Sequence, residues 1–220
     1  MTRVVALVPM RHSSERVPGK NYRDLGGRPL YAHVITTLLE SGVVDEVVVD
    51  TDSPTVTEGI ATAFPQVRVL ERPEHLRAGE VPMNDVIGHD ISQVEADLYL
   101  QTHTTNPLLR PATVRAAVEA FLASPEHDSL FTVTPLHTRL WTEHGEPINH
   151  DPKVLLRTQD LPPVYEENSN MYLFSGELLR RTGSRIGSHP LLYPVDAEEA
   201  WDIDVELDWT VVETLLARRG

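Results

Sequence analysis

The sequence has 220 residues, with 33 acidic and 19 basic side chains, a formal charge of −14 and no cysteine. This length and a hydrophobic fraction of 40% suit one packed domain, so we expect a single domain spanning residues 1–220. The absence of cysteine excludes a disulfide scaffold, a thiolate nucleophile and a zinc site with sulfur ligands. No apolar stretch suits a membrane span and the start lacks signal-peptide features, which favours a cytoplasmic protein with no membrane partner. The negative charge argues against nucleic acid as a partner.

The charge is distributed unevenly along the chain. Residues 3–28 carry six basic side chains against two acids, whereas residues 196–208 carry seven acids and no base. A positive segment and an acidic segment are consistent with a phosphate-binding site and a metal-binding site, although a solvated surface is the commoner explanation of a charged run.

Short apolar runs alternate with amphipathic segments along most of the chain. The runs typical of buried strands are residues 4–8, 47–51, 67–70, 98–101, 129–134 and 172–174. Helical spacing of apolar residues predicts helices over residues 29–39, 54–64, 83–94, 111–123 and 205–217.

This alternation indicates an α/β fold with an open, doubly wound, mainly parallel sheet. In such sheets, ligands bind outside the carboxyl ends of the strands. We therefore expect the loops after Val8, Val49 and Leu100 to form the functional site.

Residues 135–165 interrupt the alternation. The stretch is polar and rich in proline, with weak periodicity. It nevertheless carries large apolar side chains, which a disordered linker rarely holds: Leu140, Trp141, Ile148, Val154, Leu155 and Leu156. We interpret the stretch as an excursion of the domain that packs against a second subunit, so a homodimer is expected.

The loop over residues 9–21, directly after the first strand, is rich in groups that bind phosphate. Backbone N–H groups can cradle phosphate oxygens, the Arg11 guanidinium can chelate two of them, and Lys20 can act as a point charge. The loop is not a Walker A motif, because Gly19-Lys20 is followed by Asn21. A basic surface loop is the alternative interpretation.

The loop over residues 100–110 follows the fourth predicted strand and precedes a helix. Side chains such as Gln101, His103 and Thr104 can hydrogen-bond hydroxyl groups or a carboxylate. Threonine clusters and Asn-Pro pairs also commonly form turns and helix caps, so this loop alone does not define a site.

Residues 201–209 contain alternating carboxylates. In an extended segment, the side chains of Asp202 and Asp204 point to the same side. Mg²⁺ is usually held by one or two such carboxylates together with phosphate oxygens and water. Alternatively, Asp204 caps the helix that follows it.

Together, these segments make the chain resemble the acylneuraminate cytidylyltransferase family, the CMP-sialic acid synthetases. The family pattern R-x-x-S-x-x-x-P-x-K-N is matched with its spacing by Arg11, Ser14, Pro18, Lys20 and Asn21. The family pattern D-I-D-x-E-x-D is matched closely by residues 202–208. Looser matches are residues 101–108 and the segment Asn168-Ser169-Asn170-Met171-Tyr172.

The resemblance implies a Rossmann-like nucleotidyltransferase that transfers CMP from CTP to the anomeric hydroxyl of a 2-keto sugar acid, with Mg²⁺ as cofactor. It implies catalytic roles for Arg11, Lys20, Asp202 and Asp204, with both aspartates as metal ligands. The implied nucleotide-binding residues are Arg11, Ser14, Lys20 and Asn21. The implied substrate-binding residues are Gln101, His103, Thr104 and Asn168.

Two features leave alternatives open. Residues 76–85 depart from the family segment that reaches the nucleotide, so another nucleotide remains an alternative to CTP. Residues 102–106 differ from the commoner Pro-Thr-Ser pattern, so legionaminate-like, pseudaminate-like and shorter ulosonate acids all remain candidates. A nucleotidyltransferase for another sugar, or a non-catalytic binding protein on the same fold, is the competing hypothesis.

Overall fold

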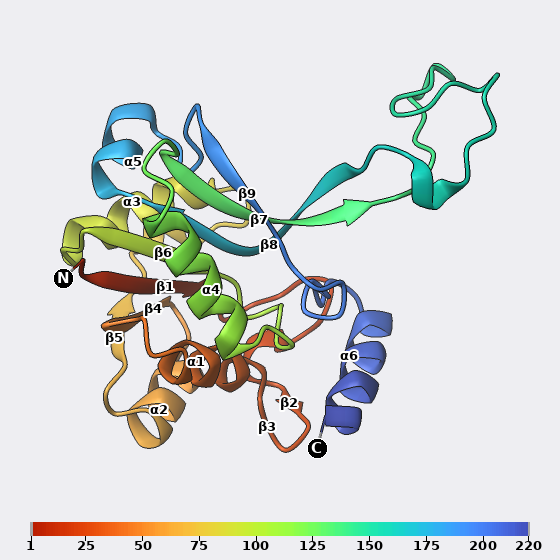
Figure 1. Ribbon diagram of the computed structural model, residues 1–220. Helices are drawn as coiled ribbons and strands as arrows, with labels where there is room; N and C mark the ends of the chain where they lie inside the picture. Colours follow the sequence, from red (N-terminus) through yellow and green to blue (C-terminus); the bar gives the residue numbers. More distant parts are fainter. Residues whose placement is uncertain (1, 220) are drawn as a thin grey trace.

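The computed structural model describes residues 2–219 and is built on a seven-stranded sheet with the order β5-β4-β1-β6-β8-β7-β9 (Figure 1). Its strands are β1 (Val4–Met10), β4 (Glu46–Thr51), β5 (Arg68–Glu71), β6 (Leu98–Thr102), β7 (Ser129–Leu136), β8 (Val164–Phe174) and β9 (Pro190–Pro194). A short hairpin, β2 (Asp24–Leu25) and β3 (Arg28–Pro29), lies outside this sheet. Within residues 2–219, none of the helices combines the length and hydrophobicity that a membrane span requires.

The sheet is mostly parallel, as the sequence predicts. The neighbours of β1 and β4 all run parallel to them, and β7 and β9 are also parallel. The exception is β8, which lies antiparallel to both β6 and β7. Every residue of β1 is buried, which is the pattern of a central strand covered on both faces.

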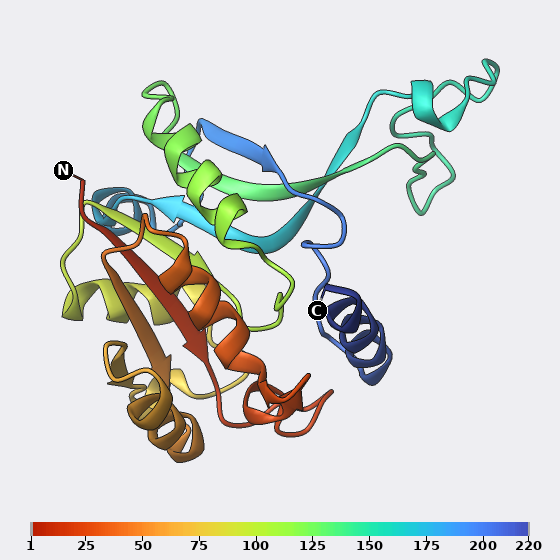
Figure 2. The same cartoon turned by 60° about the horizontal axis from the view of Figure 1, so that its bottom comes forward.

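Helices cover both faces of the sheet (Figure 2). They are α1 (Leu30–Glu40), α2 (Pro54–Ala63), α3 (Met83–Gln93), α4 (Pro111–Leu122), α5 (Gly176–Thr182) and α6 (Glu206–Arg219). Apolar side chains of α1, α2 and α4 pack on one face of the sheet, whereas those of α3 and α5 pack on the other. The five predicted helices are present, with ends that differ from the prediction by no more than about two residues.

Besides the short hairpin of β2 and β3, three elements escape the sequence prediction in whole or in part. β8 begins at Val164, well before the predicted start at residue 172, and β9 and α5 are absent from the prediction. The first half of β8 is largely solvent-exposed and pairs with β7 alone, so it lacks the apolar run of a buried strand. α5 has seven residues, which is too short to show a helical period.

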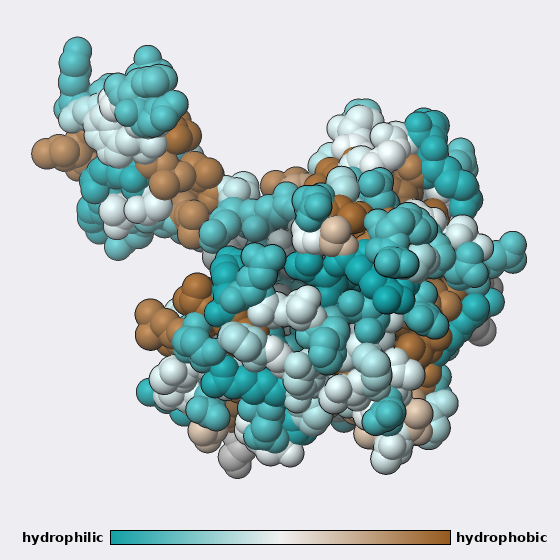
Figure 3. Space-filling model, turned by 180° about the vertical axis from the view of Figure 1, so that it is seen from behind, coloured by the Kyte–Doolittle hydropathy of each residue, from teal (hydrophilic) through white to brown (hydrophobic). Residues whose placement is uncertain are grey.

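The excursion leaves the body of the molecule between β7 and β8, as a projection over residues 137–163 (Figure 1). Most of its large apolar side chains remain exposed, and Leu155 is 87% accessible. Figure 3 shows hydrophobic residues at the surface of this projection, among hydrophilic ones. Within residues 2–219 of the single chain, no other apolar surface covers these side chains, so they remain in contact with water.

The C-terminal helix α6 is attached through a separate apolar cluster. Ile203, Trp209 and Val212 pack there against Val17 and Leu108, which belong to the loops after β1 and β6. This cluster brings the acidic segment of the sequence against the two loops that were predicted to form the site.

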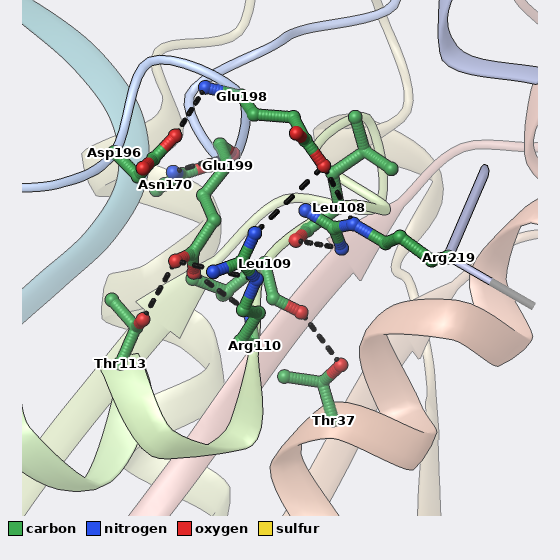
Figure 4. Close-up of polar contacts among 10 residues, drawn as sticks. All are labelled: Thr37, Leu108, Leu109, Arg110, Thr113, Asn170, Asp196, Glu198, Glu199 and Arg219. Atoms are coloured by element: carbon green, nitrogen blue, oxygen red, sulfur yellow. Dashed lines mark hydrogen bonds and ion pairs between the residues drawn. The ribbon is translucent and has the colours of Figure 1, made fainter. Parts of the chain in front are cut away.

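Glu199 anchors the acidic segment to the sheet and to α4 (Figure 4). Its carboxylate is buried and accepts hydrogen bonds from the Arg110 backbone N–H and the Thr113 hydroxyl, both at 2.9 Å. Its backbone carbonyl accepts a hydrogen bond from the Asn170 side chain, also at 2.9 Å. Because Arg110 is the N-cap of α4, the negative charge of Glu199 also interacts favourably with the dipole of this helix.

We expect Glu199→Ala to lower the free energy of unfolding by about 2 kcal/mol, because it removes two hydrogen bonds to a buried carboxylate and a favourable charge at a helix N-terminus. Urea denaturation followed by circular dichroism measures the change. Glu213→Ala, at an exposed position of α6, is the control and should change the value by no more than about 0.5 kcal/mol. Equal losses in both variants would contradict the anchoring role of Glu199.

Candidate nucleotide-binding and acceptor-binding site

A cavity of about 490 Å³ lies at the carboxyl ends of β1 and β6. The loops after these two strands line it, as the sequence predicts, together with segments that follow β5. Its basic lining residues are Arg11, Arg16, Lys20 and Arg72, against the acids Glu15 and Glu80. In a chain with a charge of −14, this cavity is a local excess of positive charge, which suits a polyanionic ligand.

The loop after β4 was also expected to line the cavity, and it does not. Instead it supports the loop after β1. Asp52 accepts a hydrogen bond from the His12 backbone N–H at 2.7 Å, and the Ser53 hydroxyl lies 2.8 Å from the His12 ring. His12 also stacks on Tyr22, so its ring is used for packing within the loop.

Gly19 and Asn21 shape the loop after β1. Gly19 has a φ of 66°, and a Cβ at this position would lie 2.9 Å from the Tyr22 ring, so the turn requires glycine. The Asn21 amide donates to the Arg11 carbonyl at 2.7 Å and accepts from the Thr104 hydroxyl at 2.6 Å. Asn21 therefore joins the loops after β1 and β6, while it also lines the cavity.

Lys20 and Arg16 connect this loop to the acidic segment. The Lys20 ammonium donates to the Ile203 carbonyl at 2.7 Å and lies 3.9 Å from the Asp204 carboxylate. Arg16 donates to the same carboxylate at 2.7 Å. Burial lowers the pKa of Lys20, whereas the charges of Asp202 and Asp204 oppose this shift. Two of the cations that line the cavity therefore stand beside the predicted metal ligands.

A second cavity, also of about 490 Å³, contains both of those carboxylates. Asp202, Asp204 and Asp208 line it together with Asn168 and the neighbouring residues of β8. Asp204 does not cap α6. Instead, Asp208 in the first turn of α6 accepts hydrogen bonds from the backbone N–H groups of the two residues before the helix, Asp204 and Val205, both at 2.8 Å.

The carboxylate oxygens of this segment suit a hard divalent cation. One Asp202 carboxylate oxygen is buried without a hydrogen-bond partner, and burial raises the pKa of this group. Within residues 2–219, no three His, Asp or Glu side chains converge into a self-sufficient metal site. Two carboxylates supplemented by phosphate oxygens and water are, however, the usual environment of Mg²⁺.

An irregularity in β8 directs residues toward the second cavity. The pairing of β7 with β8 shifts register between Phe131 and Val133, opposite residues 168–171 of β8. Ser169 there has a φ of 58°, the only positive value among the described non-glycine residues. As a result, Asn168 and Ser169 line the cavity, and the Asn168 amide donates to Thr134 at 3.0 Å.

Gln101 is fully buried and lines neither cavity, whereas His103 and Thr104 line the first. The Gln101 side-chain oxygen accepts a hydrogen bond from Arg185 at 2.6 Å, so its nitrogen must be the donor toward His103, 3.1 Å away. The His103 Nε2 atom then acts as an acceptor, which requires the neutral ring. In agreement, burial and the nearby charges of Arg185 and Lys20 lower the pKa of His103 to about 4.

Arg72 is a cavity residue that the sequence analysis missed. It follows β5, is 2% exposed, and is held by an ion pair with the Asp50 carboxylate at the end of β4. Asp90 of α3 is also buried beside this pair, and its carboxylate oxygens receive no hydrogen bond from a protein donor. Burial and the charge of Asp50 raise the pKa of Asp90 to about 8. A protonated Asp90 leaves one negative charge to balance the guanidinium.

The structure therefore distributes the predicted site residues over two neighbouring cavities, which meet where Arg16 and Lys20 contact Asp204. Arg11, Ser14, Lys20, Asn21, His103 and Thr104 line the first, and Asn168, Asp202 and Asp204 line the second. A Rossmann-like sheet that carries a basic cavity at its strand ends, beside a carboxylate segment, is the arrangement expected of a nucleotidyltransferase.

Comparison with known proteins identifies the family within this class. A family model described as "Cytidylyltransferase" matches residues 5–211, so the chain belongs to the cytidylyltransferase family. It is 30% identical, over 97% of its own length and 96% of the relative's, to CMP-N,N'-diacetyllegionaminic acid synthase of Legionella pneumophila. It is 29% identical, over 99% of its length, to N-acylneuraminate cytidylyltransferase A of Danio rerio, of which it spans about half (51%).

A solved structure with the same fold is that of CMP:2-keto-3-deoxy-manno-octonic acid synthetase complexed with CTP. It superposes with a TM-score of 0.74 over 100% of both chains, at 17% sequence identity. This likeness confirms the predicted α/β architecture.

We expect the variant Asp90→Asn to remove a pH dependence of stability. Asp90 binds its proton more tightly in the folded state than in the unfolded state. The stabilisation that this proton gives the folded state is therefore fully present below about pH 4 and is lost as pH rises through about 8. The free energy of unfolding of the wild type, relative to Asp90→Asn, should fall by up to about 1.4 kcal/mol for each pH unit in this interval. Urea denaturation at several pH values measures it, and parallel pH curves for the two proteins would contradict the assignment.

Proposed function

We propose that this enzyme transfers CMP from CTP to the anomeric hydroxyl of a sialic-acid-like 2-keto sugar acid, and that it releases pyrophosphate. The observation that carries the proposal is a contact between the two cavities. Lys20 and Arg16, two of the four basic residues that line the first cavity, form ion pairs with Asp204, which lines the second. The names of the relatives from Legionella pneumophila and Danio rerio support a sugar acid as the acceptor.

The first cavity suits the triphosphate. Arg11 forms no ion pair within residues 2–219, so its planar guanidinium is available for two phosphate oxygens. Lys20 adds a point charge, and Ser14 adds a hydroxyl donor to the same cavity wall. Asn21 holds the loop in place through its bonds to Arg11 and Thr104.

Asp202 and Asp204 would hold Mg²⁺ at the boundary between the two cavities. When bound, the ion would neutralise charge that develops on the phosphate oxygens. The partnerless oxygen of Asp202 supports this role. Lys20 and Arg16 keep the Asp204 carboxylate at the cavity boundary, where the α-phosphate and an acceptor hydroxyl would meet.

The second cavity and the loop after β6 suit a polyhydroxylated acceptor. Asn168, His103 and Thr104 present hydrogen-bonding groups from separate elements of the fold. Transfer at a phosphate depends on in-line positioning and charge neutralisation more than on a covalent intermediate. The absence of cysteine is therefore compatible with the reaction.

We expect Asp204→Ala to reduce Mg²⁺-dependent pyrophosphate release from CTP and a 2-keto sugar acid by at least about 100-fold, because it removes a metal ligand beside the transferred phosphate. A panel of nucleotides and 2-keto acids, read by pyrophosphate release, measures the activity. Asp196→Asn, an exposed acid of the same segment, is the control and should retain it.

Two results would refute this assignment. Wild-type turnover by Asp204→Ala would remove the metal-binding role. A preference of the wild type for another nucleotide, or for a sugar 1-phosphate, would replace CTP or the acid in the proposed reaction.

We also propose that the enzyme is a homodimer in which the projection over residues 137–163 packs on a second copy of the chain. Its exposed large apolar residues support this arrangement: Trp141, Ile148, Val154, Leu155 and Leu156. Removing such side chains from water contributes about 25 cal/mol for each Å² of apolar area. A cytoplasmic location remains a prediction.

We expect Leu155→Glu to convert the dimer to a monomer, because it places a charge where an apolar side chain that is 87% exposed in the single chain would be covered. Size-exclusion chromatography with light scattering measures the mass. Leu207→Glu, at a 71% exposed position of α6, is the control and should leave the mass of a dimer unchanged. A monomeric wild type would refute the proposal.

A further inference from the structure

Arg185 is a partly buried cation that contacts two strands of the central sheet. It belongs to the connection between α5 and β9, and its guanidinium lies 3.6 Å from the centre of the Tyr172 ring. One of its nitrogens donates to the Gln101 side-chain oxygen at 2.6 Å. Both partners belong to strands at the centre of the sheet, so the position of this cation is determined by the fold.

The charge of Arg185 has no carboxylate partner. No ion pair involves Arg185 within the described residues, and burial lowers its pKa. Glu167 is the acid whose field it feels, but the Glu167 carboxylate accepts a hydrogen bond from the Tyr172 hydroxyl instead. A partly buried guanidinium without a counter-charge is unfavourable, unless a ligand supplies that charge.

Among the residues that the structure describes, the remaining guanidinium donors have no protein acceptor, and they are not fully sealed from solvent. Of its nitrogens, one has the Gln101 oxygen as a partner, and none is both unpaired and sealed from solvent. A guanidinium with free donors in one plane matches the two oxygens of a carboxylate. Stacking on Tyr172 fixes the orientation of that plane, so little rotational freedom is lost when an anion binds.

The contacts of Arg185 lead to both cavities. Through Gln101 it connects to His103, which lines the first cavity. Through Tyr172 it connects to Ser169, which lines the second: the Tyr172 hydroxyl lies 3.3 Å from the Ser169 hydroxyl. Arg185 itself lines neither cavity and reaches each of them through one intervening side chain, whereas four other basic residues line the first cavity directly.

We propose that Arg185 binds the carboxylate of the acceptor acid, and that Gln101 and Tyr172 hold its guanidinium in place for this purpose. The inference rests on the proposed function. It makes Arg185 a specificity-determining residue: the enzyme selects an acid over a neutral sugar through this one charge.

The test compares Arg185→Met with the wild type in steady-state kinetics. Loss of a charge-assisted pair should raise the KM for the acid about 10- to 100-fold, while the KM for CTP remains unchanged. Arg185→Lys should recover part of the loss, because it keeps the charge without the planar fork. Arg181→Met, an exposed arginine at the end of α5, is the control and should behave as the wild type.

A modified acceptor adds a second measurement. The carboxamide of the acid should be a poor substrate of the wild type, and Arg185→Met should discriminate between acid and carboxamide at least about 10-fold less than the wild type does. This comparison depends on the charge of the acceptor. A change in packing alone would affect acid and carboxamide equally.

The outcomes separate the two proposals. If the wild type uses the acid but Arg185→Met keeps its KM, or keeps full discrimination against the carboxamide, the role of Arg185 is refuted and the proposed function stands. A raised KM for CTP in place of the acid would assign Arg185 to the triphosphate and also refute the inference. If the wild type uses no 2-keto sugar acid, both proposals fall.

Discussion

The site depends on how the charge of Lys20 is balanced. Its side chain is almost entirely buried, and the groups that compensate it belong to a segment more than 180 positions later in the chain. A buried ammonium needs both a hydrogen-bond acceptor and nearby negative charge, and Ile203 and Asp204 supply them. The loop after β1 and the carboxylate segment must therefore assemble together, and neither is complete without the other.

Much of the architecture could be predicted because its central elements obey simple periodicities. β1, β4 and β6 are buried on both faces and are therefore continuous apolar runs, while the long helices show one apolar side. β8 could not be found in full, because its outer half is exposed and its inner half contains a register shift at residues 168–171. Neither feature has a local signature in the sequence.

The site was predictable where it follows strand ends or dense local motifs. Arg11, Lys20, Asp202 and Asp204 belong to such segments, and the fold places them in two neighbouring cavities. Arg72 and Arg185 are two of the 17 arginines in the sequence, and neither belongs to a recognisable motif. Their significance arises only from what they touch: a buried carboxylate in one case, and a ring and an amide from the sheet in the other.

The continuity of β8 limits where the chain tolerates changes in length. The strand extends from the base of the projection to the centre of the sheet, and it carries the residues that face the second cavity on the way. An insertion or deletion of one residue within it would turn every following side chain to the opposite face. Extra residues between positions 137 and 163 would leave that alternation intact. The projection can therefore change in length and sequence, while the residues that line the second cavity keep their geometry.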